Sequence, residues 1–207
     1  MEQNANNKII LRGKAVSEPV FSHEVFGESF YSFEIEIKRL SGQTDILPVM
    51  ISERLIFDGN ITAGRRYYIE GQLRSYNIME ENKSRLQLRT FAKEIYSADE
   101  EEEDINVITL DGFICKTPVY RVTPFSREIA DVLIAVNRSY GKSDYIPTIC
   151  WGRNARYCQH LNVGEAISVE GRLQSREYQK KLSEDNIVNR IAFEVSISKM
   201  NVEKKDV

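Results

Sequence analysis

One short stretch of the chain, residues 139–152, places aromatic rings beside a basic residue and turn-forming residues. It reads SYGKSDYIPTICWG and contains Tyr140, Tyr145 and Trp151 together with Lys142. Flat rings stack on other flat π-systems, and ammonium or guanidinium groups bind anions. A ligand with flat rings and negative charges would match both features, provided that the surrounding elements hold these side chains on one surface.

Alternation along the chain predicts which of these side chains share a surface. In an extended strand, residues two apart lie on the same face. Residues 145–151 have the composition of a strand, and Tyr145 and Trp151 are six apart, so their rings lie on one face. The inward set is Ile146, Thr148 and Cys150, and the outward set is Tyr145, Pro147, Ile149 and Trp151.

The strand predicted around residues 166–178 repeats this arrangement of rings and charges. Its inward set is Val169, Gly171 and Leu173, and its outward set is Arg172, Gln174, Arg176 and Tyr178. Such a surface fits single-stranded nucleic acid, because every base has a π-face and every phosphate a charge. An alternative stays open, because aromatic residues are ordinary strand formers and another subunit can cover an outward face.

An internal repeat shows how these strands are organised. Shifting the sequence by 99 residues superposes glycines, prolines and charged residues, and a shift of 100 pairs IEGQLRS at 69–75 with VEGRLQS at 169–175. The shift then grows to 105, so the second copy has a longer hairpin, which contains Lys180 and Lys181. The matched pairs at a shift of 99 are Gly13 and Gly112, Pro19 and Pro118, Arg39 and Arg138, Gly42 and Gly141, Asp45 and Asp144, Pro48 and Pro147, and Arg54 and Arg153.

Each copy consists of β-branched or alternating runs separated by turn residues, with one short helical segment after the third run. Five strands with a helix between the third and fourth predict a small Greek-key barrel, the OB-fold. The predicted fold is therefore all-β, with tandem OB-folds at 1–98 and 105–207. Six acidic residues at 99–104 repel one another and predict a solvated linker. We also keep open that this segment competes with phosphates for nearby Lys and Arg.

Composition excludes several other classes of protein. The formal net charge is −3, but residues 105–207 have three more basic than acidic side chains. No apolar run reaches the roughly 18 residues of a membrane span, and the start MEQNANNK has no signal-peptide core, so we expect a cytoplasmic, nucleoid-associated protein with no membrane contact. The cysteines, Cys115, Cys150 and Cys158, form no CxxC pair, which predicts reduced thiols rather than a disulfide or zinc site.

The sequence lacks the residues that an enzyme would need. His23 and His160 are the only histidines, and neither belongs to a nucleophile motif. The GKS at 141–143 lacks the glycine that a phosphate-binding loop requires five residues before Gly141, where Val136 stands. We therefore expect no catalytic residue, no metal and no cofactor.

The second copy resembles the bacterial single-stranded DNA-binding proteins. The matching motifs are ITLDGFICKTPVYR at 108–121, IAVNRSYGKSDYIPTICWGRNARYC at 134–158 and VGEAISVEGRLQSREY at 163–178. The resemblance implies that four aromatic residues stack on bases: Tyr140, Tyr145, Trp151 and Tyr178. The basic residues near them are the candidate phosphate contacts: Arg138, Lys142, Arg153, Arg172, Arg176, Lys180 and Lys181.

The first copy lacks aromatic residues at the equivalent positions, which are Ser41, Ile46, Ser52 and Ile78. We therefore expect it to be mainly structural, although Tyr68 and Tyr76, with Arg74 between them, leave a weak or differently placed groove open. Variants of the family with two OB-folds per chain typically pair two chains. The resemblance thus implies a homodimer with four barrels.

The implied function is sequence-independent binding of single-stranded DNA in replication, recombination or repair. Family members usually end in an acidic tip that recruits replication and repair proteins, whereas this sequence stops at NVEKKDV. Recruitment through that tip is therefore in doubt, and an auxiliary role is as plausible as a housekeeping one. The alternative function is an OB-fold interaction platform in a primosome-like or mobile-element replication complex.

Overall fold

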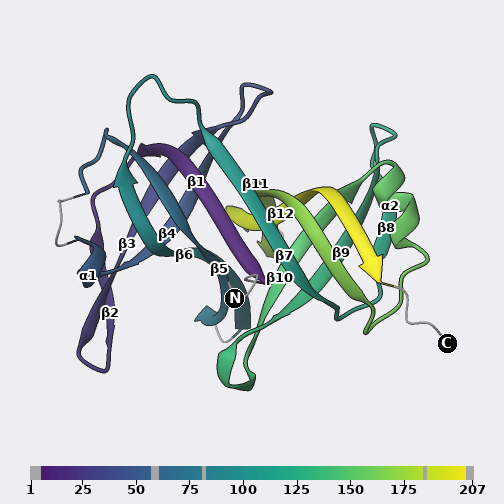
Figure 1. The fold of residues 1–207 in the computed structure, drawn as a ribbon. Coiled ribbons are helices and arrows are strands. Elements are labelled where there is room, and N and C mark those ends of the chain that lie inside the picture. Colours follow the sequence, from purple (N-terminus) through teal and green to yellow (C-terminus); the bar gives the residue numbers. More distant parts are fainter. Residues whose placement is uncertain (1–5, 57–60, 81–82, 184–185, 204–207) are drawn as a thin grey trace.

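Each half of the chain forms six strands, and all twelve join in one sheet (Figure 1). The computed structural model describes residues 6–56, 61–80, 83–183 and 186–203. The first half contains β1 (Asn7–Ala15), β2 (Val20–Val25), β3 (Glu28–Lys38), β4 (Thr44–Ser52), β5 (Arg66–Glu80) and β6 (Lys83–Ser97). The second half contains β7 (Ile105–Ile114), β8 (Val119–Val122), β9 (Glu128–Asn137), β10 (Ser143–Trp151), β11 (Ala166–Ser183) and β12 (Asn186–Glu203).

A parallel strand pair closes each half into a barrel. β4 runs beside β6, and β10 runs beside β12, while the other neighbouring strands are antiparallel. Helix α1 (Glu53–Ile56) follows β4, and α2 (Arg153–Cys158) follows β10. The predicted all-β fold with two OB-folds, each with a helix after its third main strand, is confirmed. The short edge strands β2 and β8, which pair with β3 and β9, were not predicted.

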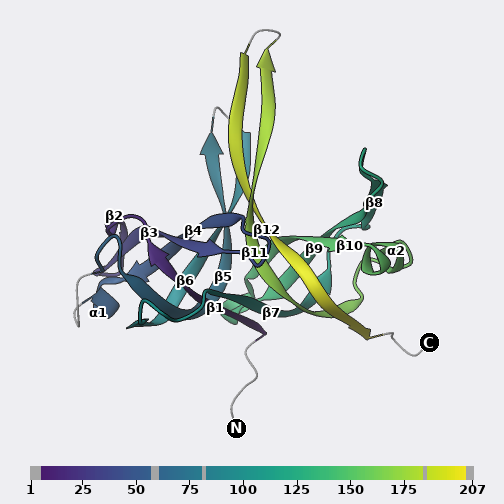
Figure 2. The ribbon, with the colours of Figure 1, turned by 90° about the horizontal axis from the view of Figure 1, so that it is seen from above.

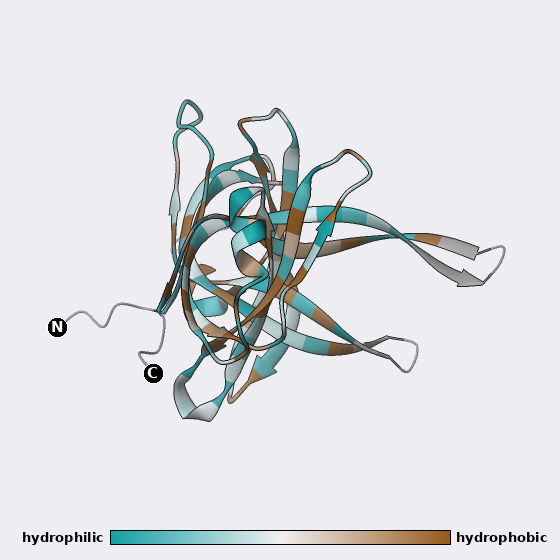
Figure 3. Cartoon of the chain, turned by 90° about the vertical axis from the view of Figure 1, so that its right-hand side faces the viewer, coloured by the Kyte–Doolittle hydropathy of each residue, from teal (hydrophilic) through white to brown (hydrophobic). Residues whose placement is uncertain are grey.

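The barrel interiors are filled by the inward residues of alternating strands. In β1 the side chains of Ile9 and Leu11 are fully buried, and in β7 those of Ile108 and Leu110 take the same places. Apolar and polar residues alternate along the strands in Figure 3. Because alternation has a period of two in any strand, this part of the fold follows directly from the sequence.

Repeated glycines mark the points where two backbones approach closely. A Cβ atom on Gly13 would lie 2.2 Å from the carbonyl oxygen of Glu36, and one on Gly112 would lie 2.5 Å from that of Ala135. At these residues β1 and β7 turn from one neighbouring strand to another. The glycine pair that the repeat revealed is therefore required by the shape of the barrel.

The two barrels are joined by antiparallel pairing of β1 with β7, from Asn7 opposite Leu110 to Arg12 opposite Ile105. Side-chain amides reinforce the ends of this junction. The amide of Asn7 donates to the carbonyl oxygen of Leu73 at 2.7 Å and accepts from its N–H at 2.9 Å. Asn106 makes the same two bonds to Leu173, at 2.7 and 2.9 Å. The junction is thus nearly symmetric.

A fully buried carboxylate of the first barrel reaches across the junction. Asp45 accepts two hydrogen bonds from the guanidinium of Arg39, at 2.6 and 2.5 Å. Its Oδ1 also accepts from the backbone N–H and the hydroxyl of Ser175 in β11, at 2.7 and 3.0 Å. The carboxylate of this ion pair in the first barrel therefore also binds a strand of the second barrel.

Asp144 is the reciprocal carboxylate of the second barrel and is also fully buried. It accepts from Arg138 at 2.6 Å on each oxygen, from the N–H of Ser75 at 2.7 Å and from Arg74 at 2.9 Å. Burial alone raises the pKa of both aspartates, but the hydrogen bonds from arginine and serine outweigh it, so that both pKa values are lowered. Both groups are therefore ionised acceptors at neutral pH.

The acidic segment at 99–104 is tied to the first barrel at its C-terminal end. The carboxylate of Asp104 pairs with Arg66 at 2.5 Å and accepts from the N–H of Lys38 at 2.6 Å. Backbone carbonyls of Glu102 and Glu103 accept from Arg66 and Arg12. The segment predicted as a solvated linker is therefore in contact with the first barrel through Asp104.

Two hairpins, β5–β6 and β11–β12, project from the same side of the molecule (Figure 2). The strands of the first hairpin have 15 residues each, and those of the second have 18. The second hairpin reaches farther, as the shift of 105 in the repeat predicts. Near the outer end of the first hairpin, Arg85 of β6 donates to the carbonyl oxygen of Ile191 in β12 at 2.7 Å.

Candidate nucleic-acid interface

The outer face of β10 presents two of the predicted aromatic rings. Tyr145 is 47% exposed and Trp151 is 40% exposed, whereas Ile146 and Cys150 are fully buried. The alternation expected for these residues is therefore confirmed. The expectation for Ile149 is wrong, because this side chain is only 4% exposed. It lies on a strand paired on both sides, opposite Asp131 of β9 and Ser196 of β12, so its neighbours cover it.

The ring of Trp151 is held in place by a neighbouring strand. Its Nε1 donates to the hydroxyl of Ser196 in β12 at 3.2 Å. On the other side, Trp151 lies opposite Ile129 of β9, whose side chain is buried. An indole fixed in this way loses little conformational freedom when a base stacks on it. The role of Ser196 was missed in the sequence, because the bond joins strands that are 45 residues apart.

Tyr140 lies at the tip of the loop between β9 and β10, in a 3-10 turn (Ser139–Gly141). Its side chain is 99% exposed. The backbone has φ 62°, which is unusual for a residue other than glycine. A hydrogen bond of 2.7 Å from the N–H of Arg138 to the carbonyl oxygen of Lys142 closes the loop. The ring is thus held out in solvent by a tight turn.

Tyr178 lies on the projecting part of β11, where it is partly exposed. The guanidinium carbon of Arg176 is 5.7 Å from the centroid of its ring. Arg176 is also 3.5 Å from a carboxylate oxygen of Glu194. One ring and one cation are therefore adjacent on this strand. The expectation that Gln174 points outward is wrong, because its side chain is buried and donates to Glu194 at 2.9 Å.

Three other basic side chains predicted as phosphate contacts, those of Lys142, Arg153 and Arg172, are exposed. Arg172 donates to the side-chain carbonyl of Gln174 at 3.3 Å. Desolvation lowers the pKa of Arg172, and the positive charge of Arg39 lowers it further. The carboxylate of Asp45, which pairs with Arg39, acts in the opposite direction and raises the pKa of Arg172. The side chains of Lys180 and Lys181 lie outside the described residues.

Arg138 has a structural partner instead. Both of its donors to Asp144 are used in a buried ion pair, and that carboxylate is needed at the junction. Pulling this guanidinium toward a phosphate would leave a buried charge unpaired. We therefore remove Arg138 from the candidate phosphate contacts.

The first barrel differs at the equivalent positions. Ser52 is buried, and Ile46 is exposed. Arg74, which might have joined Tyr68 and Tyr76 in a groove, is paired with Asp144. The hydroxyl of Tyr76 is buried without a hydrogen-bond partner, and burial raises its pKa. The cation of the groove that the sequence left open at Tyr68 and Tyr76 is thus engaged in a contact within the protein.

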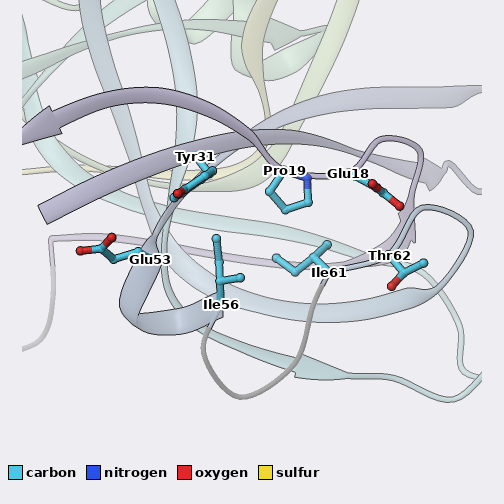
Figure 4. Close-up of a pocket in the computed structure, with 7 residues that line it drawn as sticks. All are labelled: Glu18, Pro19, Tyr31, Glu53, Ile56, Ile61 and Thr62. Carbon is cyan, nitrogen blue, oxygen red and sulfur yellow. The ribbon is translucent and has the colours of Figure 1, made fainter.

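Other kinds of site find little support among the described residues. No cluster of three or more His, Cys, Asp or Glu that could hold a metal ion occurs in them. None of their helices is long and apolar enough to cross a membrane. Cys115, Cys150 and Cys158 are free thiols. Figure 4 shows a pocket on the first barrel that none of the predicted site residues lines: its residues are Glu18, Pro19, Tyr31, Glu53, Ile56, Ile61 and Thr62.

The fold resembles solved structures over nearly the whole chain. The wild-type single-stranded DNA-binding protein from Thermus aquaticus superposes with a TM-score of 0.77 at 17% identity, covering 97% of this chain and 94% of that one. A deletion mutant of the same protein gives the same TM-score at 18% identity. At such low identity the likeness establishes the fold alone.

A family model matches the second barrel, and single proteins match part of the chain. The model of the Single-strand binding protein family matches residues 105–202. The single-stranded DNA-binding protein of Clostridium tetani is 30% identical over 84 residues, and single-stranded DNA-binding protein 1 of Staphylococcus aureus is 33% identical over 84 residues. The match covers 37% of this chain in both cases, and 58% and 50% of those two relatives.

A third relative is covered more fully. Single-stranded DNA-binding protein B of Bacillus subtilis is 33% identical over 86 residues, which are 37% of this chain and 74% of that protein. The region that the family model matches, residues 105–202, contains the four predicted stacking residues and the motifs that surround them. On these matches, the chain belongs to the single-strand binding protein family.

Proposed function

We propose that the chain binds single-stranded DNA without sequence specificity, through the outer face of the second barrel. The observation that carries this proposal is the exposure of Tyr145 and Trp151 on one face of β10, with the indole of Trp151 anchored by Ser196. Tyr140 and Tyr178 extend the aromatic surface onto the adjoining loop and hairpin. Stacking accepts every base, so no sequence readout is expected.

The cations around these rings supply the phosphate contacts in this proposal. Lys142 lies beside Tyr140, Arg153 follows Trp151, and Arg172 and Arg176 lie on the outward face of β11. Lys180 and Lys181 stay predicted phosphate contacts of the same strand. We infer that binding of this kind serves replication, recombination or repair, in which single strands are exposed.

Trp151 makes the test direct, because it is the only tryptophan in the sequence. We would titrate the protein with oligo-dT at two salt concentrations and record the tryptophan fluorescence. Quenching that weakens as salt rises is expected, since stacking changes the indole environment and phosphate binding releases counterions. Absence of both quenching and a gel shift would contradict the proposal and favour a protein-interaction platform.

We further propose that two chains associate, which would bring four barrels together. Support comes from the outer face of the junction, where Val107 and Phe113 of β7 are exposed, as is Tyr96 of β6. Apolar side chains on a sheet that joins two barrels are suited to burial against a second copy. Light scattering after gel filtration is expected to give two chains per particle, and one chain per particle would contradict the dimer.

A further inference from the structure

The first barrel carries three aromatic rings in contact on its outer surface. The imidazole of His23 in β2 is stacked on Phe30 of β3, with ring centroids 5.2 Å apart and an interplanar angle of 17°. Phe30 in turn contacts Phe91 of β6, with centroids 5.8 Å apart and an angle of 43°. His23 is exposed, and both phenylalanines are partly exposed. We call these three side chains the first-barrel ring cluster.

This cluster lies where the second barrel has Trp151. Phe30 is opposite Ser52 in the sheet, just as Ile129 is opposite Trp151. Phe91 corresponds to Ser196, the anchor of Trp151, at the repeat shift of 105. In the second barrel a large ring stands on the middle strand between two smaller side chains. In the first barrel a small serine stands on the middle strand, and rings stand on both flanking strands.

The size of Ser52 explains why the rings can meet. β4 lies between β3 and β6 in the sheet, so a large side chain at position 52 would separate Phe30 from Phe91. The serine hydroxyl instead donates to the carboxylate of Glu28. The exposed rings of this barrel therefore lie on the strands beside β4. Comparing only the equivalents of the four stacking residues between the two copies does not reveal them.

Cations accompany the cluster, as they accompany Trp151. Arg89 lies two residues before Phe91 on the same face of β6, with its guanidinium 5.4 Å from the ring centroid of Tyr76. Arg54 follows Ser52 and is largely exposed, although it pairs with Glu28 at 3.1 Å. At the other end of β4, Glu36 of β3 lies beside Lys14 and Lys38.

The opposite end of β4 differs between the barrels. Glu36 lies opposite Ile46, whereas the equivalent Tyr145 lies opposite Ala135. The carboxylate of Glu36 repels phosphates, so we place a bound strand at the end of β4 near Ser52, where the ring cluster lies.

We propose that His23, Phe30 and Phe91 form a second base-stacking site, which binds the same single strand that the second barrel binds. The inference rests on the proposed function, because it takes single-stranded DNA as the ligand. It replaces the expectation that the first barrel is mainly structural.

The first experiment moves the fluorescent reporter to this site. The double variant Trp151→Phe, Phe91→Trp has its single indole in the cluster, and oligo-dT of about 35 nucleotides is long enough for two barrels at up to about 16 nucleotides each. We expect quenching of this indole. Quenching of Trp151 in the natural sequence with no response from the indole at position 91 would overturn the second site and leave the proposed function intact. No response from either indole would remove both.

The second experiment measures the length of DNA that each chain covers. Phe30→Leu with Phe91→Leu keeps apolar volume but removes the π-faces, and Phe21→Leu is the matched control, because Phe21 packs edge-on against Tyr31 on the same hairpin. We expect the cluster variant to cover at least about four nucleotides fewer on poly-dT, since one OB-fold covers about 4–16. The control should cover the natural length.

Two results of that experiment would overturn the second site. One is an unchanged covered length in the cluster variant. The other is a change in particle mass by light scattering for the cluster variant alone, which would assign the rings to contact between copies. Circular dichroism melting of each variant identifies a loss of folding.

Discussion

The two barrels differ most on their outer faces and least at the junction between them. At the junction, Asp45 with Arg39 and Asp144 with Arg138 form the same buried ion pair. On the outer face, Ser52 stands where Trp151 stands, and Ile46 where Tyr145 stands. Identity between the copies therefore marks residues that both barrels need for folding and association, whereas the residues proposed to stack are among those that differ.

This difference explains why Arg138 has a structural role at the junction. Its equivalent in the repeat, Arg39, belongs to the copy that was expected to lack the binding chemistry. A residue kept in both copies is better explained by a role that both copies share. The same reasoning applies to Gly13 and Gly112, where no side chain fits.

The largest effect is expected at the junction. Replacing either buried aspartate, by Asp45→Asn or Asp144→Asn, should lower the free energy of unfolding by up to about 3 kcal/mol, because a partly buried guanidinium then lacks its counter-charge. Urea unfolding measures this loss. The control is Asp131→Asn, whose pair with Arg121 is exposed, and it should cost at most about 1 kcal/mol. A large loss for only one of the two junction variants would break the symmetry of the comparison.

The same carboxylates should make the free energy of unfolding depend on pH in the acidic range. Their pKa values in the folded protein are lower than the ordinary 3.8, so the stabilisation is present at neutral pH. It is lost as the pH falls through that ordinary value toward the folded one. The free energy of unfolding should thus decline below about pH 4, and less steeply in the two Asn variants. Equal slopes in all three proteins would assign the acid sensitivity to other groups.

The next largest effect is expected when the indole of Trp151 is removed. Trp151→Ala should weaken binding of oligo-dT by about 1–3 kcal/mol, because one stacked base loses its partner. Fluorescence anisotropy of a labelled oligonucleotide gives the affinity. Tyr157→Ala on α2 is the control, since its ring is similarly exposed, at 42%, but lies outside the proposed face. Equal weakening by both variants would show that the loss does not come from stacking at Trp151.

Charge reversal should separate the phosphate contacts from the junction arginine. Arg172→Glu or Arg176→Glu should reduce the slope of log affinity against log salt by about 1, the share of one phosphate contact. Arg138→Gln should leave that slope unchanged but lower the free energy of unfolding, because Asp144 loses its main partner. A change of salt slope in Arg138→Gln would restore Arg138 to the interface.

The smallest effect is expected from Ser52→Ala, although it is the counterpart of Trp151. Alanine keeps the small volume over which Phe30 and Phe91 meet, so affinity for oligo-dT should change by less than about 0.5 kcal/mol. A loss as large as that of Trp151→Ala would contradict the difference between the barrels. The same anisotropy titration measures it.

The sequence alone determined the two barrels and the inward and outward sets of most strands, and its resemblance to a known family implied the four candidate stacking residues of the second copy. The barrels and the alternation are local properties, because alternation has a period of two and a repeat is visible by shifting the chain against itself. The exposure of Tyr145 and Trp151 follows from their spacing on one strand. The acidic segment at 99–104 is also visible in the sequence, as a run of like charges.

Only the tertiary structure decided which side chains from distant strands meet. Closing each barrel brings β6 beside β4, so that Phe91 contacts Phe30, 61 residues earlier in the chain, and Ser196 holds Trp151. Joining the barrels gives Asp144 partners from the first copy, so the ion pair of Arg138 with Asp144 is part of the junction. Such contacts depend on strand order and register across the sheet, and the alternation within a single strand carries no information about either.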